Sequence, residues 1–77
     1  MQNRTMSYEI HIGDSVEWDW GNGTASGKVT ERFTSKVSRT LDGTEVTRNA
    51  TDDEPAYLVE QEDGSEVLKS ASELRSA

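Results

Sequence analysis

The clearest alternation of apolar and polar residues lies in the segment 15–20. A period of two residues places alternate side chains on opposite faces of a strand, whereas the same residues would scatter around a helix. The sequence therefore predicts a strand with one aromatic-rich face and one acidic face. Its apolar positions are Val16, Trp18 and Trp20, and the acidic positions between them are Glu17 and Asp19.

The residues that follow this strand predict a turn and a second strand. Gly21-Asn22-Gly23 tolerate positive φ, which suits a tight turn. The segment 25–34 is rich in β-branched and aromatic residues, which favour strands, and Gly27 is expected to mark a bulge or kink in it. We expect the rest of the chain to be organised around this hairpin.

A second hairpin is predicted over residues 36–49, because Asp42-Gly43 is a strong signal for a two-residue turn. This turn pairs Leu41 with Thr44, Arg39 with Val46 and Val37 with Arg48, and it places those six residues on one face. The other face is wholly polar, so one face can pack on the protein while the other meets water or a partner.

The C-terminal part predicts two more strands and a helical turn. Pro55 cannot donate to a sheet, so a strand is expected just after it, at 57–61, and the acidic turn 62–65 leads to a strand at 66–69. Ser70 followed by Glu73 matches the capping box, which predicts a short helical turn packed on the rim. At the other end, Ile10 and Ile12 are expected on one side of a short lead-in strand.

Together these elements predict a single all-β domain, a small barrel over residues 13–77 with 36–49 as an inserted hairpin. Residues 1–12 are expected to be a partly ordered lead-in, of which Met1–Thr5 is a dispensable extension. With 77 residues the core is thin, and the chain contains no cysteine to staple it. The start lacks the apolar run of a signal peptide, and no segment approaches the ~20 apolar residues of a membrane span. We expect a soluble, cytoplasmic protein.

The charge distribution is uneven. The net charge is −7, which argues against generic binding to nucleic acid. Seven acidic and no basic residues lie between Asp52 and Glu66, while five basic residues lie between Lys28 and Arg48. One interpretation is a solvated surface that keeps the protein soluble; the other is a two-signed surface that binds a partner.

No catalytic, metal or cofactor site is predicted. His11 is the only histidine, and it has no nucleophile at an interpretable spacing. The turn 21–23 lacks the lysine and helix of a phosphate-binding loop, and the acidic run 52–54 lacks the spacing of a calcium loop. We therefore expect a protein that is not an enzyme.

The order of these elements resembles small SH3-like barrels, and the segment 57–74, which ends in Ser72-Glu73-Leu74, resembles the closing half of a Tudor domain. More closely, the chain resembles the hypervirulence-associated protein family of Tudor-like domains, over nearly everything from Gly13 to Leu74. The motifs that carry this resemblance agree in order along the chain: Gly13-Asp14-x-Val16-x-Trp18-x-Trp20-Gly21-x-Gly23, Val46-Thr47-Arg48-Asn49-Ala50, Pro55-Ala56-Tyr57-Leu58-Val59-Glu60-Gln61 and Val67-Leu68-Lys69-Ser70. The resemblance implies an SH3-like, Tudor-type fold and says little about mechanism.

Tudor domains that bind methylated side chains enclose the cation with aromatic rings, and Trp18, Trp20, Phe33 and Tyr57 could supply rings here. The turn between the two closing strands, however, carries Glu60, Glu62 and Asp63 where further aromatics are typical. The alternative is that Trp18, Phe33 and Tyr57 form the core, with Trp20 partly exposed at the rim.

The favoured hypothesis is a non-catalytic module that binds a peptide or protein segment. A nucleic-acid-binding module that uses the basic hairpin is the alternative, and cross-strand pairs of Arg39 or Arg48 with Glu31 or Glu45 would account for the same basic residues. The oligomeric state is left open. The predicted contact surface consists of Trp18, Trp20, Tyr57, Arg39, Arg48 and Asn49.

Overall fold

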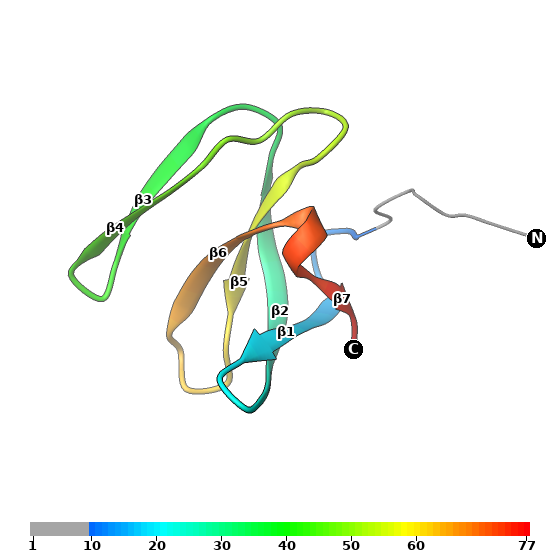
Figure 1. Ribbon diagram of the computed structural model, residues 1–77, viewed down its shortest axis with the longest axis vertical. Coiled ribbons are helices and arrows are strands. Elements are labelled where there is room, and N and C mark those ends of the chain that lie inside the picture. Colours follow the sequence, from blue (N-terminus) through cyan, green and yellow to red (C-terminus); the bar gives the residue numbers. More distant parts are fainter. Residues whose placement is uncertain (1–9) are drawn as a thin grey trace, which may run out of the picture.

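The computed structural model describes residues 10–77, and it consists almost entirely of strands (Figure 1). One 3-10 turn, η1 (Ala71–Glu73), lies near the C-terminus, as the capping-box pattern predicted. The strands are β1 (Ser15–Trp20), β2 (Gly23–Phe33), β3 (Val37–Leu41), β4 (Thr44–Arg48), β5 (Ala56–Glu60), β6 (Glu66–Ser70) and β7 (Arg75–Ser76).

The strands form two antiparallel sheets. The larger sheet has the order β6-β5-β2-β1-β7, and β3 and β4 form the smaller one. Within residues 10–77 no hydrogen-bonded ladder joins the two, so the all-β, Tudor-like prediction is confirmed but the sheets do not close into a continuous barrel. The strand β7 pairs with β1, a pairing that the sequence did not predict.

Strand β2 is long enough to pair with two other strands, one after the other along its length. Its first half pairs with β1 and its second half with β5. The register with β5 shifts between Val29 and Glu31, so the bulge falls at Thr30 rather than at Gly27. The Thr30 hydroxyl donates to the Leu58 carbonyl at 3.2 Å. Thr30 is therefore an extra residue in β2 with no partner in β5. Such an extra residue bends a strand and increases its local twist.

Two apolar clusters pack on β5. Because successive side chains of a strand point to opposite faces, Tyr57 and Val59 enter one cluster and Ala56 enters the other. This explains why β5 is buried along nearly its whole length, from Ala56 to Val59. The first cluster contains Ile10, Val16, Trp18, Val29, Tyr57, Val59, Ala71 and Leu74; the second contains Val37, Ala50, Ala56 and Leu68.

The β3–β4 hairpin has the predicted register, with Val37 opposite Arg48 and Arg39 opposite Val46. Asp42 and Gly43 both adopt positive φ, at 53° and 79°, as a two-residue turn of this type requires. Its mixed face carries Val37, Leu41 and Val46 into or against the second cluster.

The prediction of a lead-in strand is wrong for residues 10–12, which are the part of it that the structure describes. Ile10 is buried, but Ile12 is 64 % exposed and lies in a turn rather than on the same side of a strand. The Asp14 carboxylate stabilises this turn by accepting a hydrogen bond from the His11 backbone at 2.8 Å. Glu9 and the predicted extension Met1–Thr5 lie outside the described residues.

Within residues 10–77, no helix is long and apolar enough to cross a membrane.

Candidate binding surface

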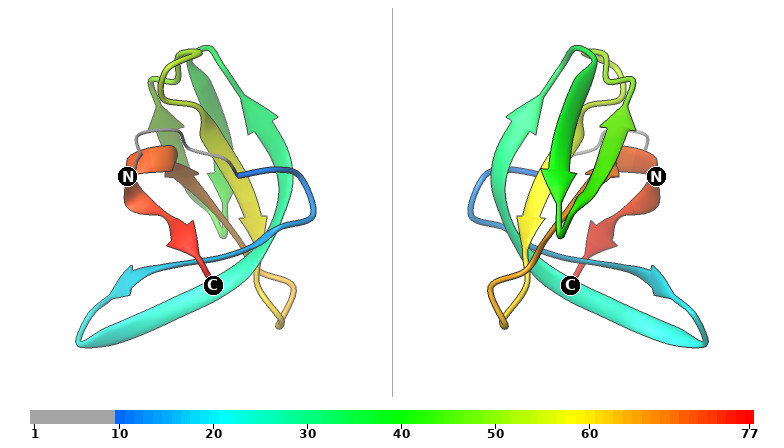
Figure 2. Two further views of the ribbon diagram at one scale, coloured as in Figure 1. Left: turned by 90° about the vertical axis from the view of Figure 1, so that its right-hand side faces the viewer. Right: turned by 90° about the vertical axis from the view of Figure 1, so that its left-hand side faces the viewer.

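The end of the β1–β2 hairpin projects from the body of the protein, as the two views of Figure 2 show. Trp20 is the last residue of β1 and lies opposite Gly23. Trp18 is two residues earlier on the same face and lies in the first cluster at 3 % exposure, whereas Trp20 is 71 % exposed. The aromatic face of β1 therefore begins in the core and ends in solvent.

Trp18 and Tyr57, two of the predicted contact residues, are core residues. Tyr57 is fully buried, and its hydroxyl donates to the Ile10 carbonyl at 3.3 Å. Phe33 is half-buried, and the guanidinium of Arg39 lies 4.9 Å from its ring centre. Because Trp18 and Tyr57 are buried in the core, they offer no open ring faces to a cation, so the four described rings do not form an aromatic cage.

Arg39 is engaged by its neighbours on the hairpin and on β2. Its Nη2 lies 3.3 Å from Glu31 Oε1, which is one of the cross-strand pairs that the sequence suggested. Its Nη1 donates to the Ser38 carbonyl at 3.0 Å. Both terminal nitrogens of Arg39 thus have a partner within the chain.

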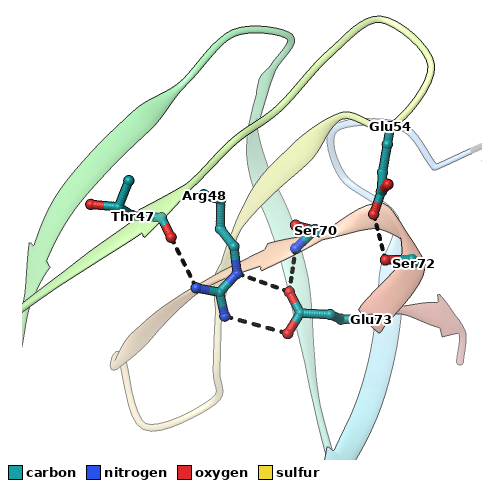
Figure 3. Close-up of polar contacts among 6 residues, drawn as sticks. All are labelled: Thr47, Arg48, Glu54, Ser70, Ser72 and Glu73. Atoms are coloured by element: carbon teal, nitrogen blue, oxygen red, sulfur yellow. Dashed lines mark hydrogen bonds and ion pairs between the residues drawn. The ribbon is translucent and has the colours of Figure 1, made fainter.

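Arg48 connects the hairpin to the turn η1 (Figure 3). Its Nε and Nη2 donate to the two carboxylate oxygens of Glu73, at 3.0 and 3.3 Å, and its Nη1 donates to the Thr47 carbonyl. The Ser70 backbone donates to the same carboxylate at 2.7 Å. Partial burial works to raise the pKa of Glu73, but the hydrogen bonds from Arg48 and Ser70, with the charges of Arg48 and Lys69, outweigh it and lower the pKa.

The predicted contact surface is therefore divided. Asn49 is exposed just after β4, and Arg39 and Arg48 lie on the β3–β4 hairpin, whereas Trp20 lies at the end of β1. Figures 1 and 2 show these two hairpins pointing to different sides of the molecule. No local sequence signal sets the orientation of one hairpin relative to the other.

A groove beside β1, which we call the β1–η1 groove, was not predicted from the sequence. Arg75 of β7 borders it and donates to Glu17 Oε2 at 2.8 Å and to Asp19 Oδ1 at 3.0 Å, and these hydrogen bonds, that to Asp19 foremost, raise the pKa of Arg75. The Lys69 ammonium lies 6.0 Å from the centre of a Trp18 ring. The groove has a volume of about 480 Å³ and is lined by Trp18, Asp19, Lys69, Ser72, Glu73, Leu74 and Arg75.

A larger hollow of about 720 Å³ lies beside the β5–β6 turn, and no aromatic residue lines it. Gly27 borders it, where an added Cβ would lie 2.6 Å from the Glu60 carbonyl oxygen. Within residues 10–77, no group of three or more histidine and carboxylate side chains is arranged to hold a metal ion.

Comparison with known proteins supports the resemblance found in the sequence. Searches of curated proteins and of solved structures found no match. The sequence model of the hypervirulence associated proteins TUDOR domain, in contrast, matches residues 13–74. This match covers both hairpins, the β5–β6 pair and η1, which is most of the chain, and the chain therefore belongs to the hypervirulence-associated TUDOR domain family.

Proposed function

We propose that this protein is a non-catalytic binding module for a peptide or protein segment and that Trp20 is its principal contact. Tudor-like domains are typically binding folds without catalytic activity. The observation that carries the proposal is the exposure of Trp20, at 71 %, in a chain with only 31 % hydrophobic residues.

The energetics of burial support a contact role for this ring. A partner that covers it removes apolar surface from water, which contributes about 25 cal/mol per Å². Tryptophan is also enriched among the few residues that dominate binding energy, because it offers a large contact area with little conformational entropy to lose. Gly23 lies opposite Trp20 and has no side chain to cover the ring.

The contacts of the basic hairpin favour a peptide over a nucleic acid. Arg39 and Arg48, which would have to meet phosphates, already carry Glu31 and Glu73 as carboxylate partners. The net charge of −7 adds long-range repulsion of a polyanion.

The test compares two exposed apolar side chains. Peptides selected by display on the wild-type protein are titrated into Trp20→Ala and into Ile12→Ala, the latter removing the other large exposed apolar residue among residues 10–77. We expect Trp20→Ala to weaken binding about tenfold or more, which corresponds to about 1.4 kcal/mol, and Ile12→Ala to leave it unchanged. Both variants should keep the wild-type melting temperature. Unchanged affinity in Trp20→Ala would overturn the proposal, and so would a collapse of its stability.

A further inference from the structure

Lys69 places a positive charge beside Trp18 of β1. Its ammonium lies over Trp18, 6.0 Å from the ring centre, in the β1–η1 groove. The arginines Arg39, Arg48 and Arg75 each have a carboxylate within 4 Å. Lys69 has no carboxylate within 4 Å among residues 10–77, although its charge helps to lower the pKa of Glu73, so its ammonium has room for a closer partner.

The carboxylates that line the same groove are already engaged. Arg48 donates two hydrogen bonds to Glu73, and Arg75 donates one to Asp19. Arg75 also donates to Glu17, so its one guanidinium is shared by two carboxylates, whereas Arg48 pairs with Glu73 alone. The Lys69 ammonium is the one charged group lining the groove that takes part in no ion pair within 4 Å among residues 10–77.

Trp20 does not line the groove but lies close to it along β1. Trp18 lines it, and Trp20 lies two residues further along the same face of β1. A bound segment can thus cover the exposed ring with an apolar side chain and place its next polar group near Lys69. A lysine suits such a contact, because its flexible stem lets the ammonium follow a carboxylate.

We propose that the β1–η1 groove binds a carboxylate of a peptide ligand, held by Lys69, next to an apolar side chain that packs on Trp20. This inference rests on the proposed function and names the chemistry of its ligand. The net charge of −7 repels a carboxylate as it repels a polyanion, but a single carboxylate carries one charge, and charges further away than about 8 Å are largely screened at physiological ionic strength.

The experiment uses two capped peptides that differ by one charge, acetyl-Gly-Ser-Leu-Phe-Asp-Ser-Gly-amide and the same peptide with Asn in place of Asp. Each is titrated into the wild-type protein, Lys69→Gln and the control Lys28→Gln, and the indole N–H resonances are followed by NMR. Lys28 lines the hollow beside the β5–β6 turn and not the β1–η1 groove, so its removal changes the net charge equally without touching the site.

We expect the wild-type protein to bind the Asp peptide about threefold more tightly than the Asn peptide, as exposed ion pairs allow. This preference should vanish in Lys69→Gln, persist in Lys28→Gln and shrink when the salt concentration rises from about 0.05 to about 0.5 M.

Three results would overturn the inference. If both peptides bind equally and shift the Trp20 resonance, Lys69 is not a carboxylate site, although the proposed function stands. If the Asp peptide binds more tightly as salt rises, repulsion by the whole protein outweighs any local pairing. If neither peptide binds, the groove does not take this chemistry, and the display-selected peptides then decide separately whether Trp20 binds another ligand.

Discussion

The path of β2, the longest strand, requires a residue without a side chain at position 27, which is Gly27. At this position β2 passes close to the end of β5, and an added Cβ would lie 2.6 Å from the Glu60 carbonyl oxygen and 2.7 Å from Val59 Cγ1. One of these neighbours is backbone, so it cannot rotate away. A glycine is required here because the two chains approach each other, and not because the strand bulges at this residue.

We expect Gly27→Ala to destabilise the protein by about 1–3 kcal/mol, the usual cost of forcing extra atoms into a packed site. The matched control is Gly23→Ala in the same strand, where an added Cβ meets nothing within 4 Å. Chemical denaturation of both variants measures the difference. Equal stability of the two would show that β2 and β5 separate at little cost.

Among the elements, the β3–β4 hairpin depends most clearly on long-range contacts. It pairs with no strand of the larger sheet, and its apolar face packs on the second cluster. The Arg48–Glu73 ion pair then joins it to η1, and the Ser72 hydroxyl joins η1 to Glu54 in the loop before β5 (Figure 3). These polar contacts fix the hairpin to the turn that follows β6.

This ion pair should make stability depend on pH. The pKa of Glu73 is lower in the folded protein than its ordinary value of 4.5, so its contribution is complete above that value and is lost as the pH falls through the folded pKa. We expect Glu73→Gln to cost about 0.5–1 kcal/mol at neutral pH, allowing for solvent screening of a side chain that is 37 % exposed.

The difference between the wild type and Glu73→Gln should shrink below pH 4.5, which urea titrations at several pH values would reveal. Glu45→Gln, on the polar face of the same hairpin, is the control and should match the wild type throughout. A pH-independent difference would mean that Glu73 acts by packing and not by its charge.

At the scale of the whole molecule, β5 and β6 connect two small cores. Tyr57 and Val59 belong to the first cluster, whereas Ala56 and Leu68 belong to the second. Neither cluster is large, and each uses one face of the same buried strand. The loss of either cluster would therefore expose residues that stabilise the other.

We accordingly predict that the chain unfolds in one cooperative transition. In Trp20→Phe, the fluorescence of Trp18 reports on the first cluster alone, and far-UV circular dichroism reports on both sheets. The two thermal curves should coincide. Leu68→Ala, in the second cluster, should lower both midpoints together and cost about 2–4 kcal/mol. An early loss of circular dichroism with Trp18 still buried would show that the hairpin unfolds by itself.

Much of the local structure could be predicted because it depends on short-range geometry. The Asp42-Gly43 turn fixes every pair of the β3–β4 hairpin, since a two-residue turn sets the register of both strands. The alternation in β1 placed Trp18 and Trp20 on one face, and the bounds of that strand were predicted correctly. Strand β5 and η1 followed from Pro55 and from the pairing of Ser70 with Glu73.

The tertiary structure decided which of these residues meet. The sequence offered a core Trp18 with an exposed Trp20 as one of two arrangements, but periodicity could not choose it, because the choice depends on which residues of β5 and of the segment 71–74 pack with Trp18. It also could not place Arg48 against Glu73, 25 residues away, or Arg75 against Asp19, 56 residues away. The sequence alone determined strands, turns and faces, since these depend on neighbouring residues. Only long-range packing, which brings distant segments together, decided the groove and the exposed ring.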